Sequence, residues 1–193
     1  MSKELIQIGR TPSEQRIYDL LQSVGENPDR EGLQETPTRV VKAWEFWTRG
    51  YAMNPADILK TFEDGAENCD EMVVRKGIPL YSKCEHHMAD IFGVCTIAYI
   101  PNGRVVGLSK MDRLVEVFAA RLQVQERLTT QIADAMMEHL KPKGVGVWVS
   151  ARHMCVESRG VRNRDSETQT TALRGVFKDQ DATRAEFMSL VRS

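Results

Sequence analysis

The chain has 193 residues, 41% of them hydrophobic, so it is long enough to bury a core of its own. Its formal net charge is −1, with 26 basic against 27 acidic residues, which excludes a global basic surface for nucleic acid or anionic membranes. No run of about 18 apolar residues predicts a membrane-spanning helix, and Met1-Ser2-Lys3-Glu4 leads into no signal peptide, so we expect a cytoplasmic protein. The four cysteines should then be reduced, which favours metal or catalytic roles over disulfides.

Two amphipathic helices are predicted first along the chain. Thr11-Pro12-Ser13-Glu14 offers a cap, a proline at the first helical position and a glutamate three residues after the cap. Thr36-Pro37 begins a second helix in the same way. Residues 54–71 are acidic and weakly patterned, which indicates a short helix and a loop. We assign residues 1–71 to an N-terminal helical segment and residues 72–193 to the main domain.

Beyond this segment, stretches typical of strands are mixed with helical ones. Asn102-Gly103 readily supplies positive φ angles, so we expect a tight hairpin that turns strand 95–100 back into a strand at 105–108. Ser109-Lys110-Met111-Asp112 matches a capping box and should begin a helix. The predicted elements are strands at 72–74, 78–81, 95–100, 105–108, 145–155 and 168–176, and helices at 109–122, 126–140 and 182–190. This order predicts an α+β fold whose antiparallel sheet is covered on one face by helices.

The stretch Cys84-Glu85-His86-His87 is poorly suited to a core and well suited to a metal. Thiolate and imidazole are ligands that zinc prefers, and three protein ligands with one open position are typical of a catalytic zinc site. Cys84 and His87 are three residues apart, so one turn of chain can direct both at one ion. Cys155 is the best candidate for the third ligand. Strand periodicity over residues 145–155 places His153 and Cys155 on the same face, directed into one site.

The alternative is that these cysteines only pack in the core, because free cysteines are common in protein cores. Cys69 lies in a polar loop and Cys95 begins an apolar strand, so we give both a structural role. For Cys84 and Cys155, the neighbouring histidines favour the metal site.

Two histidines beside the proposed ligands are candidates for proton transfer. A zinc ion with an open position lowers the pKa of bound water to about 7, and attack by hydroxide must be accompanied by proton transfer. His86 and His153 flank the ligands, and an unperturbed imidazole titrates near pH ~6.5. Either histidine could instead orient one of the metal ligands through a hydrogen bond. His139 falls late in a predicted helix, where the helix dipole is sufficient explanation.

Basic residues cluster at two places that would suit an anionic substrate. Ser109, Lys110 and Arg113 lie at a predicted helix start, where free backbone N–H groups favour phosphate. The second group follows Cys155 and consists of Arg159, Arg162 and Arg164. Taken singly, each residue is explained as a helix cap or a solvated surface charge. Together with a metal site, the set suggests a surface that binds polyphosphate.

Gln125-Glu126 joins two predicted helices and has two possible roles. The carboxylate of Glu126 could accept hydrogen bonds from N1–H and the exocyclic amine of a guanine, assisted by Gln125. A glutamate is also common at the start of a helix, which is the simpler explanation from chemistry alone.

Several separated motifs make the chain resemble the GTP cyclohydrolase I family, the first enzymes of pterin and folate synthesis. The likeness covers most of the chain, and its motifs occur in the family's order. They are the stretches 27–33, 36–40, 43–46, Cys84-Glu85-His86-His87, 97–103, 107–110, 121–129, His153-Met154-Cys155 and 159–162.

The resemblance implies a role for each candidate residue. Zinc would be held by Cys84, His87 and Cys155, and protons would be moved by His86 and His153. The other roles implied are guanine recognition, by Gln125 and Glu126, and triphosphate binding, by Ser109, Lys110, Arg113 and Arg159. In the family, zinc-activated water opens the imidazole ring of GTP at C8, formate leaves, and rearrangement gives 7,8-dihydroneopterin triphosphate.

The resemblance also implies an architecture. Family members have the tunnelling fold, with an antiparallel four-stranded sheet and two helices on one face, here preceded by the N-terminal helical segment. Similar members form homodecamers of two face-to-face pentamers, with active sites between subunits. Zn2+ is then the cofactor and GTP the substrate, with no nucleic acid and no membrane as partner.

The sequence departs from the family after His87, where Met88-Ala89-Asp90-Ile91-Phe92 replaces the usual leucines, proline and phenylalanine. Val156-Glu157-Ser158 is also more polar than the family pattern. Two alternatives therefore accompany the main hypothesis: a divergent paralogue with altered activity, and a zinc-stabilised oligomeric module without catalysis, which would need a fourth ligand such as Cys95 or His86. A zinc deaminase would need the H-x-E and P-C-x-x-C patterns, which the sequence lacks. A nucleophilic hydrolase using Cys84 would leave Cys155 and His153 without a purpose.

Overall fold

A computed structural model describes residues 9–62 and 68–192 of the chain. Residues 63–67 of the predicted loop lie outside the described residues, as do residues 1–8, on which the signal-peptide expectation depends. The chain separates into two compact units, Met1–Trp47 and Thr48–Ser193. The division at residue 71 stays a prediction. No helix among the described residues is both long and apolar enough to cross a membrane.

The first unit contains the two predicted N-terminal helices. Helix α1 spans Pro12–Ser23 and α2 spans Thr36–Trp47, with a short 3₁₀ helix, η1, at Glu31–Leu33. The capping box is confirmed, because the Thr11 hydroxyl accepts from the Glu14 N–H at 3.3 Å and the Glu14 carboxylate accepts from the Thr11 N–H at 2.8 Å. The other Glu14 carboxylate oxygen accepts from the Thr38 hydroxyl at 2.6 Å, which ties the two helices together.

The second unit begins with a 3₁₀ helix, η2 (Arg49–Ala52), followed by α3 (Pro55–Ile58) and the short strand β1 (Thr61–Phe62). Gly50 lies against the end of another helix, α4 (Leu108–Ala119), and its N–H donates to the Ala120 carbonyl at 3.0 Å. A Cβ at Gly50 would lie 2.3 Å from the Val117 carbonyl oxygen, so only glycine permits this approach.

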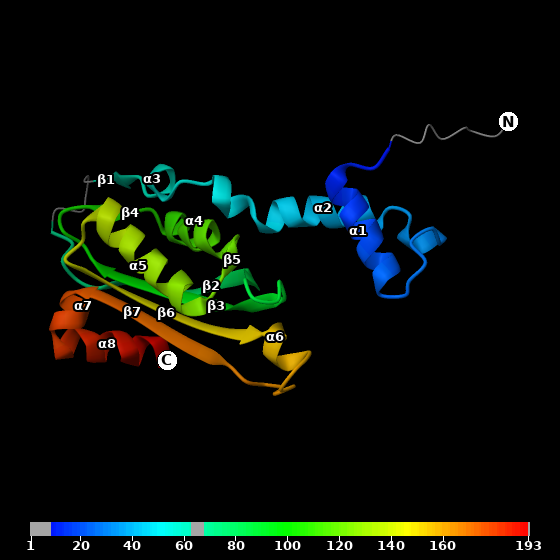
Figure 1. Cartoon of the computed structure of the whole chain (residues 1–193). Helices are drawn as coiled ribbons and strands as arrows, with labels where there is room; N and C mark the ends of the chain where they lie inside the picture. The colour runs from blue at the N-terminus through cyan, green and yellow to red at the C-terminus, as the bar shows by residue number, and fades with distance from the viewer. Residues whose placement is uncertain (1–8, 63–67, 193) are drawn as a thin grey trace. The chain divides into compact units, whose positions relative to one another are not determined.

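A five-stranded sheet forms the centre of the second unit, in the order β5-β2-β3-β6-β7 (Figure 1). Its four long strands are antiparallel and are β2 (Val73–Cys84), β3 (Asp90–Ile100), β6 (Gly144–His153) and β7 (Thr168–Gly175). The fifth, β5 (Leu122–Gln123), is short and pairs parallel to the end of β2. Helices α4 and α5 (Gln125–Leu140) cover one face. The predicted α+β fold, with a four-stranded antiparallel sheet and two helices on one face, is confirmed.

Strand periodicity places the main core between the sheet and these two helices. Val147, Val149 and Ala151 alternate along β6 and are buried in the same cluster as Leu114 of α4 and Ile132 of α5. The strand prediction was therefore correct for this face of β6.

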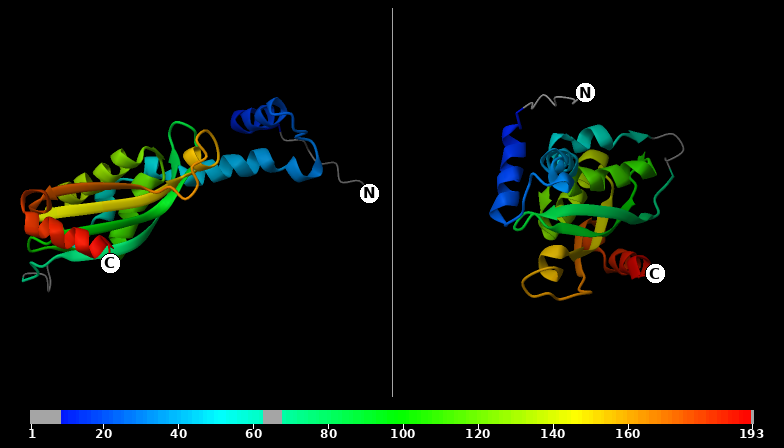
Figure 2. Two further views of the ribbon diagram at one scale, coloured as in Figure 1. Left: turned by 90° about the horizontal axis from the view of Figure 1, so that it is seen from below. Right: turned by 90° about the vertical axis from the view of Figure 1, so that its right-hand side faces the viewer.

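The opposite face of the sheet is covered as well, which the sequence analysis did not predict. Helices α7 (Val176–Asp179) and α8 (Asp181–Arg192) lie against it, as Figures 1 and 2 show. The rings of Phe177 and Phe187 meet edge to face at 5.6 Å over Ala98 of β3. The predicted closing helix is thus α8, and it buries a second, smaller core.

Two predictions about the connection after β3 were wrong. Strand β4 (Val105–Val106) pairs with β1 rather than with β3, because β3 is already paired along both of its edges with β2 and β6. The turn itself is present, with Gly103 at a φ of 72°. Ser109 is not the helix cap either: α4 begins at Leu108, and its N-cap residue, Gly107, makes no side-chain capping bond.

Strand β6 is also shorter than predicted. It ends at His153, and Met154–Glu157 forms the short helix α6 that contains Cys155. Arg152 pairs with Glu157 across this helix, and the Ser158 N–H donates to the Met154 carbonyl at 2.9 Å. Cys155 therefore reaches the site from a helical turn and not from the face of a strand.

Candidate metal centre and active site

The loop between β2 and β3 folds tightly at one end of the sheet. The Cys84 N–H donates to the Ala89 carbonyl at 2.8 Å, and the Met88 N–H donates to the Cys84 carbonyl at 2.7 Å. Met88 has a φ of 56°, an unusual value for a residue other than glycine. This turn brings His87 back toward Cys84.

Two sets of side-chain contacts hold this loop in place. Lys83, which is 7% exposed, pairs with Asp90 across the base of the loop. The carboxylate of Glu85 pairs with Arg127 in the first turns of α5, and the Glu85 N–H donates to the Gln123 carbonyl at 3.0 Å. The hydrogen bond from Arg127 lowers the pKa of Glu85. The loop is therefore attached to both β3 and the start of α5.

Cys84, His87 and Cys155 meet at this end of the sheet. Their candidate ligand atoms all lie within 4.8 Å of one another, and within the described residues they form the one such His, Cys or carboxylate group that could hold a metal. Ligand atoms around a tetrahedral zinc lie about 3.3 to 3.8 Å apart, given Zn–S near 2.3 Å and Zn–N near 2.0 Å. Two sulfurs and one nitrogen at this spacing would fit zinc once the three atoms move slightly closer together. Burial, and then the neighbouring Cys84 thiol, raise the pKa of Cys155, so metal binding would have to displace a proton.

Arg159 lies beside the metal group. Its Nη1 is 2.9 Å from Nε2 of His87, and because a guanidinium can only donate, the imidazole nitrogen accepts. A residue predicted to bind triphosphate thus reaches a predicted metal ligand.

The two predicted proton carriers have different surroundings. His86 is exposed, with its ring centroid 6.4 Å from that of His87. His153 is partly buried and its Nε2 lies 2.7 Å from Oε1 of Gln125. Burial lowers the pKa of His153, an effect opposed by the charge of the nearby Glu126 carboxylate.

The adjacent residues Gln125 and Glu126 differ in how far their side chains are exposed to solvent. Gln125 is 1% exposed, and its amide nitrogen donates to the Thr168 carbonyl at 2.8 Å, with longer contacts of 3.2 Å to the Val149 carbonyl and the Thr170 hydroxyl. Glu126 is exposed at the start of α5. Of the predicted pair, only Glu126 presents its side chain to solvent.

Three predicted triphosphate contacts lie away from the metal group. Ser109, Lys110 and Arg113 are in the first turns of α4, close in sequence to Asp112, which pairs with Arg75 at 2.7 Å. Arg75 is nine residues before Cys84 on β2, which corresponds to roughly 30 Å along an extended strand. The start of α4 therefore lies at the opposite end of the sheet from Cys84 in the same chain.

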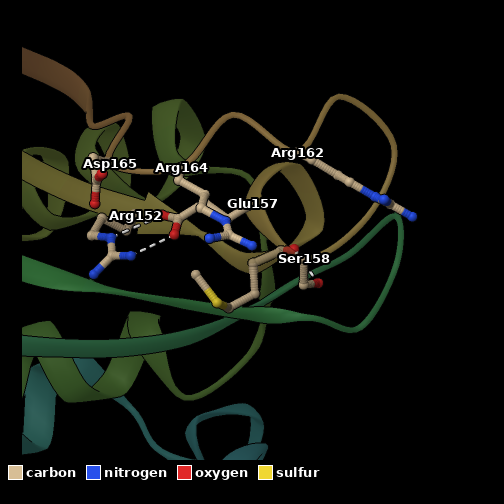
Figure 3. A pocket seen from close by; sticks show the side chains of 7 residues that line it. Arg152, Glu157, Ser158, Arg162, Arg164 and Asp165 are labelled. Atoms are coloured by element: carbon tan, nitrogen blue, oxygen red, sulfur yellow. Dashed lines mark hydrogen bonds and ion pairs between the residues drawn. The ribbon is translucent and has the colours of Figure 1, made fainter.

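A separate cavity of about 430 Å³ adjoins α6 and the loop that follows it (Figure 3). It is lined by Arg152, Met154, Glu157, Ser158, Arg162, Arg164 and Asp165. Glu157 is paired with Arg152, while the side chain of Arg162 extends away from the other labelled residues. Arg162 and Arg164 therefore belong to this cavity, whereas Arg159 contacts the metal group.

The profile of the GTP cyclohydrolase I family matches residues 13–192, which is nearly the whole chain. The chain belongs to the GTP cyclohydrolase I family. It is 59% identical to a GTP cyclohydrolase 1 from Janthinobacterium sp. (strain Marseille), over 90% of this chain and 87% of the relative. Identity to the GTP cyclohydrolase 1 of Nitrosospira multiformis is 58%, over 90% of this chain and 91% of that protein. The expected enzyme class is confirmed.

Among solved structures, the chain is similar to an archaeosine synthase QueF-like protein in its apo form. The TM-score is 0.45 at 19% identity, over 54% of this chain and 93% of the other.

Sequence reasoning missed the residues that support this site. Lys83, Gln123 and Arg127 contact the metal loop or hold its partners, and Arg127 Nε donates to Gln123 Oε1 at 3.1 Å. No periodic pattern relates these residues, because Lys83 lies in β2, Gln123 in β5 and Arg127 in α5.

Proposed function

We propose that this chain hydrolyses the imidazole ring of GTP at C8, releases formate and yields 7,8-dihydroneopterin triphosphate. The observation that carries the proposal is the meeting of Cys84, His87 and Cys155 within 4.8 Å, next to the partly buried His153. Family membership supports GTP as the substrate. Support comes from this end of the sheet, where groups that could hold a metal and move protons lie together.

Zinc is the metal that this donor set suits best. Two cysteines and one histidine would hold it, leaving one coordination position open. When bound, zinc supplies Lewis-acid activation of the water that attacks C8. Cys95 does not provide a fourth ligand: it is 0% exposed in the core and faces Val149, four residues before His153 on β6. An open position favours the enzyme over a closed structural site.

Proton transfer is assigned to His86 and His153. Ring opening requires a proton to leave the attacking water and another to reach the departing ring nitrogen. His153 is held by a hydrogen bond to Gln125, and His86 is exposed beside His87. An exposed imidazole exchanges protons readily with solvent, whereas a held one can act at a fixed position.

Substrate recognition is assigned to Glu126 and Arg159 near the metal group. Glu126 offers an exposed carboxylate that can accept from N1–H and the amino group of guanine, with its charge close to His153. Arg159 would hold a phosphate oxygen, the planar geometry of its guanidinium being well suited to that contact.

The distance between α4 and the metal group supports a shared site. Ser109, Lys110 and Arg113 can serve as triphosphate contacts only if they reach the metal group of a neighbouring copy. We therefore include a homo-oligomer, a homodecamer of two pentamers, in the proposal, with active sites between subunits. The residue pair Arg75 and Asp112 supports this by holding α4 at the far end of its own sheet.

The deciding experiment incubates zinc-loaded protein with GTP and measures formate. We expect formate in proportion to GTP consumed, together with a pterin that fluoresces after oxidation. Zinc-loaded protein that consumes no GTP and releases no formate would contradict the proposal. A product without formate would instead indicate a divergent paralogue.

A further inference from the structure

Gln125 lies in a buried network that joins α5 to two strands. Its amide nitrogen donates to the Thr168 carbonyl, and also approaches the Val149 carbonyl and the Thr170 hydroxyl. Thr170 and Thr129 share a hydrogen bond of 2.6 Å between hydroxyl oxygens, and the Thr129 hydroxyl donates to the Gln125 carbonyl at 2.7 Å. Because Thr129 uses its hydrogen on that carbonyl, Thr170 donates to Thr129.

This network fixes which way round the Gln125 amide lies. Backbone carbonyls only accept hydrogen bonds, so the group facing Thr168 and Val149 must be the amide NH2. A reversed amide would place its oxygen against two carbonyl oxygens in a buried site, with no hydrogen between them, which is unfavourable. The oxygen Oε1 therefore faces His153.

The orientation of the amide in turn fixes the imidazole of His153. Oε1 can only accept, and it lies 2.7 Å from Nε2, so Nε2 carries a hydrogen. In the neutral ring the other nitrogen, Nδ1, has no hydrogen and is the atom that can take up a proton. The protein determines this tautomer through α5, β6 and β7 together.

We propose that Gln125 is a positioning residue that holds His153 as the Nε2–H tautomer, so that Nδ1 is the ring nitrogen left open to the substrate. Guanine recognition then falls to Glu126 and not to the pair. The inference rests on the proposed function for its kinetic part, but the tautomer is a property of the protein alone. Gln125 is 1% exposed and its oxygen and nitrogen are both bonded by the chain, which leaves it little capacity to bind a base.

The first test observes the tautomer directly. The zinc-loaded full chain is labelled with ¹⁵N-histidine, and its ring nitrogens are recorded by NMR at a pH where His153 is neutral. The chain has four histidines, so the signals that disappear from the spectrum of His153→Ala assign this ring. We expect a protonated Nε2 and an unprotonated Nδ1. A His153 ring protonated at Nδ1 overturns the proposal, whether or not the protein turns over GTP.

The second test compares Gln125→Met with Glu126→Gln. Methionine keeps the volume but removes the acceptor, so the His153 tautomers should mix and kcat should fall by about 10- to 100-fold while KM for GTP stays nearly constant. Glu126→Gln should instead raise KM for GTP. Gln22→Met, an exposed glutamine in α1, serves as the matched control and should change neither quantity.

Inosine triphosphate lacks the 2-amino group of guanine, so it distinguishes a residue that positions His153 from a residue that recognises guanine. Gln125→Met should keep the wild-type preference for GTP over inosine triphosphate, and Glu126→Gln should lose it. If Gln125→Met raises KM for GTP and loses this preference with kcat unchanged, Gln125 is a guanine contact and the inference is wrong. If wild-type protein shows the Nε2–H tautomer but releases no formate, only the proposed function fails.

Discussion

Residues of the same type have different roles here because of where the fold places them. Cys84 and Cys155 lie at the end of the sheet beside His87, whereas Cys95 lies in the middle of β3 with no exposed surface. Burial raises the pKa of the Cys95 thiol well above its ordinary value, which keeps it protonated and inert. Cys84 is buried as well, at 5% exposed, so its position beside His87 and Cys155 distinguishes it from Cys95, and burial does not.

The metal assignment predicts a clear difference between two serine variants. Cys155→Ser should lose zinc, because a hydroxyl is a much poorer zinc ligand than a thiolate, and formate release should disappear with it. Zinc is measured by elemental analysis after dialysis. Cys95→Ser is the matched control: it should keep zinc and lose only stability, because it places a hydroxyl in the apolar core. Stoichiometric zinc in Cys155→Ser would remove Cys155 from the ligand set.

A second residue-scale prediction concerns the pair of Arg75 and Asp112. Its bidentate hydrogen bonds, at 2.9 and 2.7 Å, lower the pKa of Asp112 below the ordinary 3.8. A carboxyl whose folded pKa is depressed contributes stability above its unfolded pKa, and that contribution is lost as pH falls through the folded value. Asp112→Asn should therefore be less stable than wild type at neutral pH.

The size of this deficit should shrink as the pH drops below 3.8. Urea unfolding of both proteins at several pH values measures it, and since acid releases metal from both equally, the difference isolates Asp112. A deficit that is independent of pH would show that the carboxylate charge is not what stabilises the fold.

The loop joining β2 and β3 illustrates how an element is shaped by contacts outside it. Lys83 pairs with Asp90 at its base, and Glu85 pairs with Arg127 of α5. Asp90 belongs to the stretch that departs from the family pattern, and the structure gives that departure a role in closing the loop. These contacts hold Cys84 and His87 close together in the chain itself.

This pre-positioning predicts the effect of Arg127→Met on metal affinity. Methionine keeps much of the side-chain length but removes the donors to Glu85 and Gln123, so the loop should loosen and zinc affinity should fall by about 10-fold or more. Competition with a chromogenic chelator measures the affinity. Arg39→Met breaks an exposed pair between Arg39 of α2 and Glu35, the residue just before that helix, and should leave zinc affinity unchanged. Equal affinities in all three proteins would show that the contact with Glu85 does not support the site.

At the scale of the whole molecule, the residues proposed to act on one substrate lie far apart in the chain's own fold. The metal group and the start of α4 lie at opposite ends of the sheet. The ion pair between Arg75 and Asp112 attaches α4 to the end of β2 that is far from Cys84. A second copy of the chain resolves the separation if its α4 reaches across an interface. Such sharing is testable without knowing the number of subunits.

The test mixes two variants that are each inactive alone. His153→Ala removes a group from the metal end and Lys110→Ala removes one from α4. If sites are shared, co-assembled chains should recover about a quarter of wild-type activity, because random mixing gives that fraction of sites both intact halves. Lys110→Ala mixed with Arg113→Ala is the control and should recover none, since every site would then receive a defective α4. No recovery in the first mixture would place each active site within one chain.

Much of this protein is determined by local sequence patterns. The capping box at Thr11 and Glu14 acts over three residues, and the alternation of Val147, Val149 and Ala151 follows from strand geometry. The spacing of Cys84 and His87 likewise indicated two ligands on one turn. Such signals can be interpreted along the chain because the interactions behind them are local.

Other features were decided only by tertiary structure. Strand β4 pairs with β1 because β3 has no free edge, and Cys155 lies in a helix because β6 ends at His153. The burial of Gln125 depends on its contacts with Thr168, which is 43 residues away along the chain. Sheet register brings such partners together, and no local pattern carries it. The sequence by itself thus indicated which residue types gather at the site, and the pairing of the strands decided which of them contact one another.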